Sequence, residues 1–179
     1  MKTRGQLLLA VSCLALAACS ITPKTDFDRR TAFENYKTYA WAPEPQSQTA
    51  AAKHDEEIRG AVDRELVTKG LKKSAGKQPD VYLIYHITAG PKADAKHYTD
   101  WALAQGGGSY AGWAVTTQTD ATIDLARPGA LVLDFVDARR RQLVWRSVAP
   151  QIFEAPKADD RQRVAGAVKA MLAGFPPKK

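Results

Sequence analysis

Residues 130–137, ALVLDFVD, and residues 143–148, LVWRSV, decide the fold of this chain. Both runs have strand length and are rich in β-branched and aromatic residues. Leu131, Leu133 and Phe135 fall on one face of an extended chain because successive side chains point to opposite sides. Only residues 138–142 separate the two runs, so they predict an antiparallel hairpin.

Three further stretches predict strands around this hairpin. Residues 80–88, DVYLIYHIT, are apolar on both faces and predict a central strand covered on at least one side. Within residues 33–41, FENYKTYAW, Tyr39 and Trp41 alternate with Thr38 and Ala40, which predicts a short strand with an aromatic face. Alternation over residues 119–125 predicts another strand just before the hairpin.

Two stretches have the 3.6-residue spacing of amphipathic helices. The first begins near His54 and ends at Lys69, before Gly70 as a C-terminal cap; the second begins at Asp159 and ends before Gly174. The apolar stripes expected to face the core are Ile58, Ala61, Val62 and Leu66 in the first helix, and Val164, Ala167, Val168, Met171 and Leu172 in the second.

The element order β-α-β-loop-β-β-β-α predicts an α+β fold. We expect a two-layer sandwich, with a mainly antiparallel sheet of about five strands and two amphipathic helices on one face. The expected organisation is a signal peptide at residues 1–18, a lipidated tether at 19–32 and a single domain at 33–179. The domain contains a long loop rich in glycine and aromatic residues at 91–118.

The first 18 residues have the layout of a secretory signal, with a basic head and an apolar run of about ten residues. Leu16-Ala17-Ala18-Cys19 follows and resembles the bacterial lipobox. The resemblance implies cleavage before Cys19 and attachment of lipid to its thiol, which would anchor the protein in a membrane. Ser20 at the next position favours the outer membrane, facing the periplasm. The alternative is an ordinary signal with a chance cysteine.

Charge and cysteine content restrict the class of partner. The chain has a net charge of +7, and without the signal 24 basic and 19 acidic residues leave +5. The basic residues are scattered apart from residues 139–141, RRR, which we interpret as a solvated turn, so no nucleic-acid partner is predicted. Attraction to anionic head groups or to cell-wall polymer is the alternative. Only Cys13 and Cys19 occur, and the first leaves with the signal, so no disulfide is expected.

Five stretches along the chain resemble a family of bacterial envelope lipoproteins, the DUF4136 family. They are residues 33–41 FENYKTYAW, 79–86 PDVYLIYH, 129–137 GALVLDFVD, 143–146 LVWR and 171–178 MLAGFPPK. The resemblance implies a lipid-anchored α+β domain in the cell envelope, without established catalytic residues. The resemblance supports the predicted location in the cell envelope and the predicted fold. It implies no molecular activity.

The sequence offers no convincing catalytic set. His54 lies at a helix entrance, His86 in a strand and His97 in the long loop, and none is placed beside a nucleophile by its sequence context. Ser109 follows Gly108 in an incomplete match to the Gly-x-Ser-x-Gly elbow, with no strand before it or helix after it. We therefore predict no catalytic residue and no enzyme activity.

Metal and cofactor sites are not expected either. The carboxylates in residues 54–57, HDEE, are explained by the dipole at a helix start. His86 and His97 with Asp94 and Asp100 follow no known ligand spacing.

Trp101, Tyr110 and Trp113 surround the glycine run of the long loop and are the tentative partner-binding residues. The alternative is that their rings fold back over a face of the sheet. The preferred hypothesis is a non-enzymatic structural or interaction module, held on the periplasmic side of the outer membrane by lipid on Cys19. Its partner would be an unidentified envelope protein or the cell wall. The rival is an envelope ligand-binding or hydrolytic protein that uses residues 91–118 as a lid.

Overall fold

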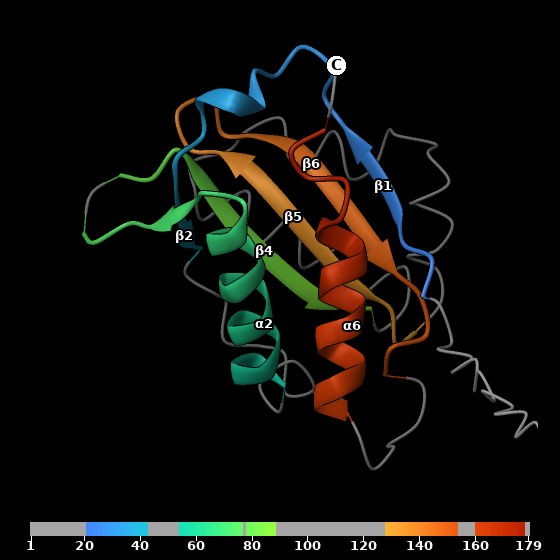
Figure 1. The fold of residues 1–179 in the computed structure, drawn as a ribbon. Coiled ribbons are helices and arrows are strands. Elements are labelled where there is room, and N and C mark those ends of the chain that lie inside the picture. The colour runs from blue at the N-terminus through green and yellow to red at the C-terminus, as the bar shows by residue number, and fades with distance from the viewer. Residues whose placement is uncertain (1–20, 43–53, 77, 89–127, 154–159, 178–179) are drawn as a thin grey trace, which may run out of the picture.

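The computed structural model describes residues 21–42, 54–76, 78–88, 128–153 and 160–177 (Figure 1). In chain order the elements are β1 (Lys24–Phe27), the 3-10 helix η1 (Phe33–Asn35), β2 (Thr38–Trp41), α2 (Asp55–Thr68), β3 (Lys72–Lys73), β4 (Val81–Ile87), β5 (Leu131–Asp137), β6 (Gln142–Ala149) and α6 (Asp160–Leu172). No helix in these ranges is long and apolar enough to span a bilayer.

The described strands form one sheet in the order β1-β6-β5-β4-β2-β3. The predicted hairpin is its centre: β5 pairs antiparallel with β6, and β4 pairs antiparallel with the other edge of β5. At one side β1 is antiparallel to β6, and at the other β2 is parallel to both β4 and β3. The parallel pairs follow from the crossover through α2, since parallel neighbours need such a connection. The mainly antiparallel sheet is confirmed, and the described part of the chain contributes six strands to it where about five were expected.

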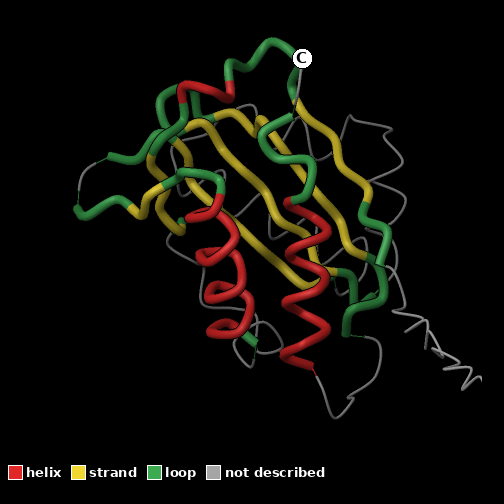
Figure 2. The backbone as a smooth tube through the Cα atoms, in the orientation of Figure 1, coloured by secondary structure: helices red, strands yellow, loops and turns green. Residues whose placement is uncertain are grey.

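The helices α2 and α6 lie side by side over one face of the sheet (Figure 2), which confirms the two-layer α+β arrangement. Every residue of the two predicted apolar stripes is buried. On the same side of the sheet the rings of Phe135, Trp145 and Phe175 contact one another, with Phe135 stacked on Phe175 at 4.5 Å between centroids. Burial of these aromatic and aliphatic side chains is the main stabilising contribution to the fold.

Helix α2 ends where the sequence predicted, at a left-handed glycine. Gly70 has φ +82°, a conformation that costs glycine little. Its N–H donates to the carbonyl of Val67 and the N–H of Leu71 donates to the carbonyl of Leu66, which are the two bonds of a Schellman motif. Leu71 is buried, so the motif also returns the chain to the core and into β3.

The opposite face of the central strands is buried as well. There Asp134 of β5 and Arg146 of β6 are register partners and form a bidentate ion pair, with Nε–Oδ1 2.7 Å and Nη2–Oδ2 2.8 Å. Both side chains are almost completely inaccessible to solvent. A paired, hydrogen-bonded geometry is what allows charges to remain in such an environment.

The described part of the expected tether, residues 21–32, contains a strand. Lys24–Phe27 forms β1 and pairs with β6, and Ile21 already packs against the core. Alternation is hard to detect in a four-residue strand, and β1 exists only because the edge of β6 is available to it. The predicted strand at 119–125 lies outside the described residues.

Candidate functional site

A polar pocket of about 460 Å³ lies at the end of the sheet where β5 turns into β6 and where β4 begins. Three chain segments that are distant in sequence meet there: the stretch between β1 and β2, the residue before β4, and the β5–β6 turn. The lining residues are Arg30, Thr31, Ala32, Asn35, Tyr36, Asp80, Asp137, Arg139 and Arg140. The pocket is thus rich in guanidinium groups and carboxylates.

Asp137, the last residue of β5, organises the turn that forms one wall. Its Oδ1 accepts hydrogen bonds from the backbone N–H groups of Arg139 at 3.0 Å and Arg140 at 2.7 Å. Its backbone carbonyl accepts from the N–H of Arg141, which adopts φ +53°. An aspartate that bonds the following N–H groups is a common way to fix a tight turn.

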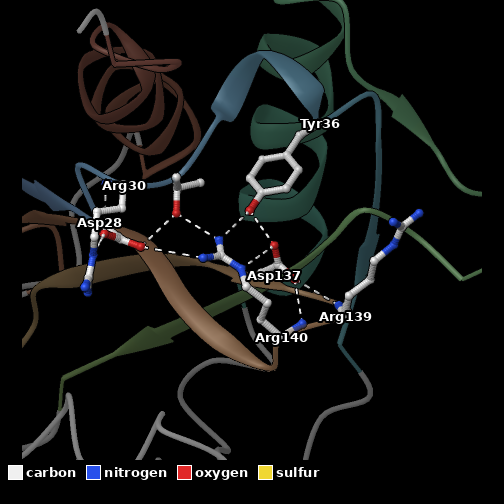
Figure 3. A network of polar contacts seen from close by, with 7 residues as sticks. Asp28, Arg30, Tyr36, Asp137, Arg139 and Arg140 are labelled. Atoms are coloured by element: carbon white, nitrogen blue, oxygen red, sulfur yellow. Dashed lines mark hydrogen bonds and ion pairs between the residues drawn. The ribbon is translucent and has the colours of Figure 1, made fainter.

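A continuous chain of polar contacts runs from this turn to the segment after β1 (Figure 3). The Tyr36 hydroxyl donates to Asp137 Oδ2 at 2.7 Å, and Arg140 Nε donates to the same oxygen at 3.1 Å. Arg140 Nη2 donates to the Thr31 hydroxyl at 2.9 Å, and that hydroxyl donates to Asp28 Oδ2 at 2.9 Å. Arg140 therefore links strand ends more than 100 residues apart.

Asp80 fixes the second wall. Its Oδ2 accepts from the N–H of Lys37 at 2.9 Å, the N–H of Thr38 at 2.9 Å and the Thr38 hydroxyl at 2.8 Å. In return, the N–H of Asp80 donates to the carbonyl of Thr38 and the N–H of Ala138 donates to the carbonyl of Asp80. Through its side chain and its backbone, this one residue joins the start of β2, the start of β4 and the β5–β6 turn.

The network holds its carboxylates ionised. Burial raises the pKa of Asp137, but bonds from the backbone of Arg140, the Tyr36 hydroxyl and the Arg140 guanidinium outweigh this and bring the pKa below its ordinary value. The backbone N–H of Lys37 is the main cause of a lowered pKa at Asp80. Burial and the neighbouring Asp137 raise the pKa of the Tyr36 phenol.

These directions limit the chemistry that the network can perform. General acid–base catalysis is most efficient when a pKa lies close to the working pH. The pKa values of Asp80 and Asp137 are lowered and that of Tyr36 is raised, so at neutral pH the two acids accept hydrogen bonds as carboxylates and the phenol donates as a neutral hydroxyl.

Two arginines at the pocket stand outside the tight part of the network. The Arg30 side chain is 94% exposed; its Nε reaches Asp28 Oδ1 at 3.4 Å, and its backbone N–H donates to the same oxygen at 3.0 Å. The positive charge of Arg139 acts on Asp80 and helps to lower the pKa of that carboxyl, without an ion pair within 4 Å in the described part of the chain. With Arg140, three arginines and two aspartates, Asp80 and Asp137, are among the lining residues, so the lining has a formal net charge of +1.

A second, smaller pocket of about 330 Å³ adjoins the first through Arg30. Its other lining residues are Asp26, Phe27, Asp28, Arg29, Gln142 and Leu143. Two aspartates and two arginines line this second pocket, so their formal charges cancel. The polar pocket around Arg140 remains the better-defined site.

The structure does not describe most of the residues that the sequence singles out as site candidates. Cys19, Trp101, Tyr110 and Trp113 lie outside the described residues, as do His97 and Ser109, so the lid hypothesis for residues 91–118 stays a prediction. His54 bonds Glu57 through Nδ1 at 3.3 Å, and its ring lies against Phe153. His86 is fully buried in β4. Among the described residues, no group of three potential metal ligands is found.

The polar pocket was missed by sequence reasoning. The run at residues 139–141 was interpreted as a solvated turn, and all three arginines are indeed exposed residues in a turn. That interpretation did not include the ion pair between Arg140 Nε and Asp137. An acid three residues before an arginine at a strand end was the available signal, whereas the partners Thr31 and Tyr36 depend on the tertiary fold.

A family model described as a domain of unknown function, DUF4136, matches residues 23–177. The chain belongs to the DUF4136 family. The match begins beside β1 and extends beyond the end of α6, so the polar pocket lies entirely within the DUF4136 domain. No curated protein matches the chain.

Solved structures share the fold of this DUF4136 domain at low identity. A DUF4136 family protein from Bacteroides thetaiotaomicron is 16% identical, with a TM-score of 0.51 over 87% of this chain and 94% of that chain. A PDZ domain protein from Parabacteroides distasonis is 18% identical, with a TM-score of 0.54 over 89% of this chain. The present chain spans only 36% of that protein. These similarities show the fold alone.

Proposed function

We propose that this protein is a lipid-anchored cell-envelope protein, attached through Cys19, that acts as a non-enzymatic interaction module on the periplasmic side of the outer membrane. In this proposal the DUF4136 domain presents its polar pocket away from the membrane. The lipobox-like Leu16-Ala17-Ala18-Cys19 supports the anchor, and Ser20 supports the outer membrane. The rigid network, whose acids and phenol have pKa values shifted away from neutrality, supports a binding role.

The observation that carries the proposal is the short distance from Cys19 to the folded domain. Ile21 packs against the core, and two extended residues span at most about 7 Å. The lipid would therefore attach almost directly to the end of the sheet where β1 begins. A domain attached this closely has little freedom to turn over on the membrane.

The pocket lies at the other end of the same sheet. Lys24 at the start of β1 pairs with Val148, near the end of β6, and Ala149 pairs with Leu131 at the start of β5. The pocket instead involves the end of β5 and the residue before β4. Seven-residue strands such as β4 and β5 separate the two ends by roughly 20 Å.

Cell fractionation of Cys19→Ala tests the anchor. Each buried acyl methylene contributes about 0.8 kcal/mol, and two or more chains hold a protein on a membrane for long periods. We expect the wild type in the membrane fraction after a high-salt wash and the Cys19→Ala protein in the soluble fraction. Cys13→Ala is the matched control and should behave as wild type. Retention of Cys19→Ala in the washed membranes would remove the proposal.

A further inference from the structure

The face of the sheet away from α2 and α6, the helix-free face, is buried although the helices do not cover it. Residues that stand opposite each other in an antiparallel pair share a face, and Asp134 and Arg146 are such a pair. By this register the helix-free face includes Ile84 and His86 of β4, Val132 and Asp134 of β5, and Arg146 and Val148 of β6. Each of these residues is at most 5% exposed.

The described elements do not account for this burial. Figure 2 shows α2 and α6 together on the other side of the sheet. Among the described residues, the buried apolar cluster on the helix-free face consists of Ala130, Val132 and Val148. Two of these belong to strands and Ala130 directly precedes β5, so the cluster contains no residue from a layer above the sheet. The cover must therefore come from outside the described ranges.

We infer that residues 89–127 of the same chain pack over the helix-free face and form a third layer. This range leaves the sheet after β4 and returns before β5. The N–H of Thr88 donates to the carbonyl of Ala130 at 2.9 Å, and the N–H of Gly129 donates to the carbonyl of Thr88 at 2.8 Å. A two-residue loop suffices to join antiparallel neighbours, so the range is far longer than the connection requires.

Both ends of this connection lie on the helix-free face. Thr88 follows His86 by two positions, and Ala130 precedes Val132 by two, so each continues the alternation of its strand. Thr88 and Ala130 are buried, and the N–H of Ala130 also donates to the Thr88 hydroxyl at 2.9 Å. The chain thus starts and finishes at the border of the surface that it covers.

The helix-free face needs a cover with both apolar and polar groups. Its apolar cluster lies on the same face as three buried polar side chains, those of His86, Asp134 and Arg146. Asp134 and Arg146 each make an interaction beyond their ion pair, and His86 makes one as well. Buried polar groups almost always have partners, so an apolar layer alone would not be sufficient.

Residues 89–127 contain side chains of both kinds. The rings of Trp101, Tyr110 and Trp113 can bury a large apolar area while their N–H or O–H groups donate hydrogen bonds. The alternation at residues 119–125 adds an apolar stripe. These residues then serve as core for the third layer, in place of the partner-binding role predicted from the sequence.

The other ranges outside the described residues are less suited to this face. Residues 43–53 lead into α2 and residues 154–159 lead into α6, both of which lie on the opposite side of the sheet. Residues 1–20 precede β1, which pairs with β6 at the border of the sheet. Only residues 89–127 both leave from and return to the central strands.

Thiol labelling tests the cover in the full chain, with Cys13→Ala and Cys19→Ala so that each introduced cysteine is the single thiol. Val132→Cys reports the helix-free face, and the matched control Val168→Cys reports the buried side of α6. We expect both to react slowly in the intact chain. Replacing residues 91–126 with a short Gly/Ser turn should speed the labelling of Val132→Cys about tenfold or more and leave Val168→Cys protected.

Three results would overturn the inference. Fast labelling of Val132→Cys in the intact chain would show an open face. Protection that disappears on dilution would assign the cover to a second copy of the chain. Protection that survives the replacement would assign it to another segment. None of these readouts depends on lipid at Cys19, so the inference and the proposed anchor can fail separately.

A replacement that exposes both introduced cysteines has unfolded the domain, and photo-crosslinking of the intact chain then decides. Tyr82 stands opposite Val136 on the helix-free face and is partly exposed. We expect p-benzoylphenylalanine at position 82 to form an adduct with a peptide from residues 89–127 of the same molecule. An adduct with any other peptide, or no adduct, would contradict the inference.

Discussion

Asp137 stabilises the pocket wall as an ionised side chain, and its contribution should depend on pH. The pKa of Asp137 in the folded protein lies below the ordinary value of 3.8. Stability from such a group is fully present above the ordinary pKa and is lost as the pH falls through the folded-state pKa. Asp28 and Asp80 have pKa values lowered in the same direction, so they add to the effect.

We expect Asp137→Asn to lower the free energy of unfolding by about 1–3 kcal/mol at pH 7, because bonds to a charged acceptor are lost. The difference in free energy of unfolding between Asp137→Asn and wild type should become smaller as the pH is lowered from about 5 to 2. Urea unfolding across this range measures both quantities. Glu65→Gln is the control, since its carboxylate makes no hydrogen bond among the described residues. A pH-independent difference would contradict the role assigned to Asp137.

The two faces of the β5–β6 hairpin carry different kinds of side chain. Its helix side is aromatic and aliphatic, whereas its other side contains the buried pair of Asp134 and Arg146. Removing one member of a buried pair leaves the other charge without its counter-ion, which costs far more than replacing both with apolar side chains.

A double-mutant cycle on this hairpin tests that asymmetry. Asp134→Leu and Arg146→Met should each destabilise the protein by about 3–5 kcal/mol, and the double variant should be more stable than either single variant. Urea unfolding of the three variants and wild type gives the interaction energy. If the double variant loses as much stability as the two single variants together, the two side chains act independently. That result would contradict the ion-pair interpretation.

The sequence predicted those elements whose hydrophobic pattern is long and regular. The stripes of α2 and α6, the hairpin and β4 were recognised because each buries a continuous face. Strands β1 (KTDF) and β3 (KK) were missed because their short sequences contain no alternating apolar residues, unlike Tyr39 and Trp41 in β2, and both form only beside an existing edge. The pocket was missed for a related reason: Thr31, Tyr36 and Asp80 become neighbours of Asp137 only through tertiary folding.

For the whole molecule, the proposed anchor fixes an orientation that can be measured. Arg163 near the start of α6 bonds the carbonyl of Ile152, just beyond the end of β6, so this helix start lies at the anchored end (Figure 1). Gln142, the first residue of β6, is exposed at the pocket end. The two ends should therefore differ in their distance from lipid.

We expect a fluorophore on Arg161→Cys to be quenched by spin-labelled lipid head groups, and one on Gln142→Cys to be quenched much less. Lipidation of Cys19 leaves the introduced cysteine as the reactive thiol of the mature protein. Inserting 15 Gly/Ser residues between Cys19 and Ile21 provides the control, because a flexible linker permits reorientation. Equal quenching at both sites without the insertion would contradict the proposed orientation.

The pairing of β1 with β6 also bears on how such a protein is made. Thr25 and Ser147 contact each other across 122 positions of sequence, at 3.0 Å between hydroxyl oxygens. Long loop closures of this kind are slow to form. If the chain is exported from its amino end and lipidated as proposed, β1 would have no strand to join until β6 emerged. Cys19 would therefore remain on an undocked segment through most of translocation, giving the acylating enzymes access to its thiol before folding draws the neighbouring residues against the domain.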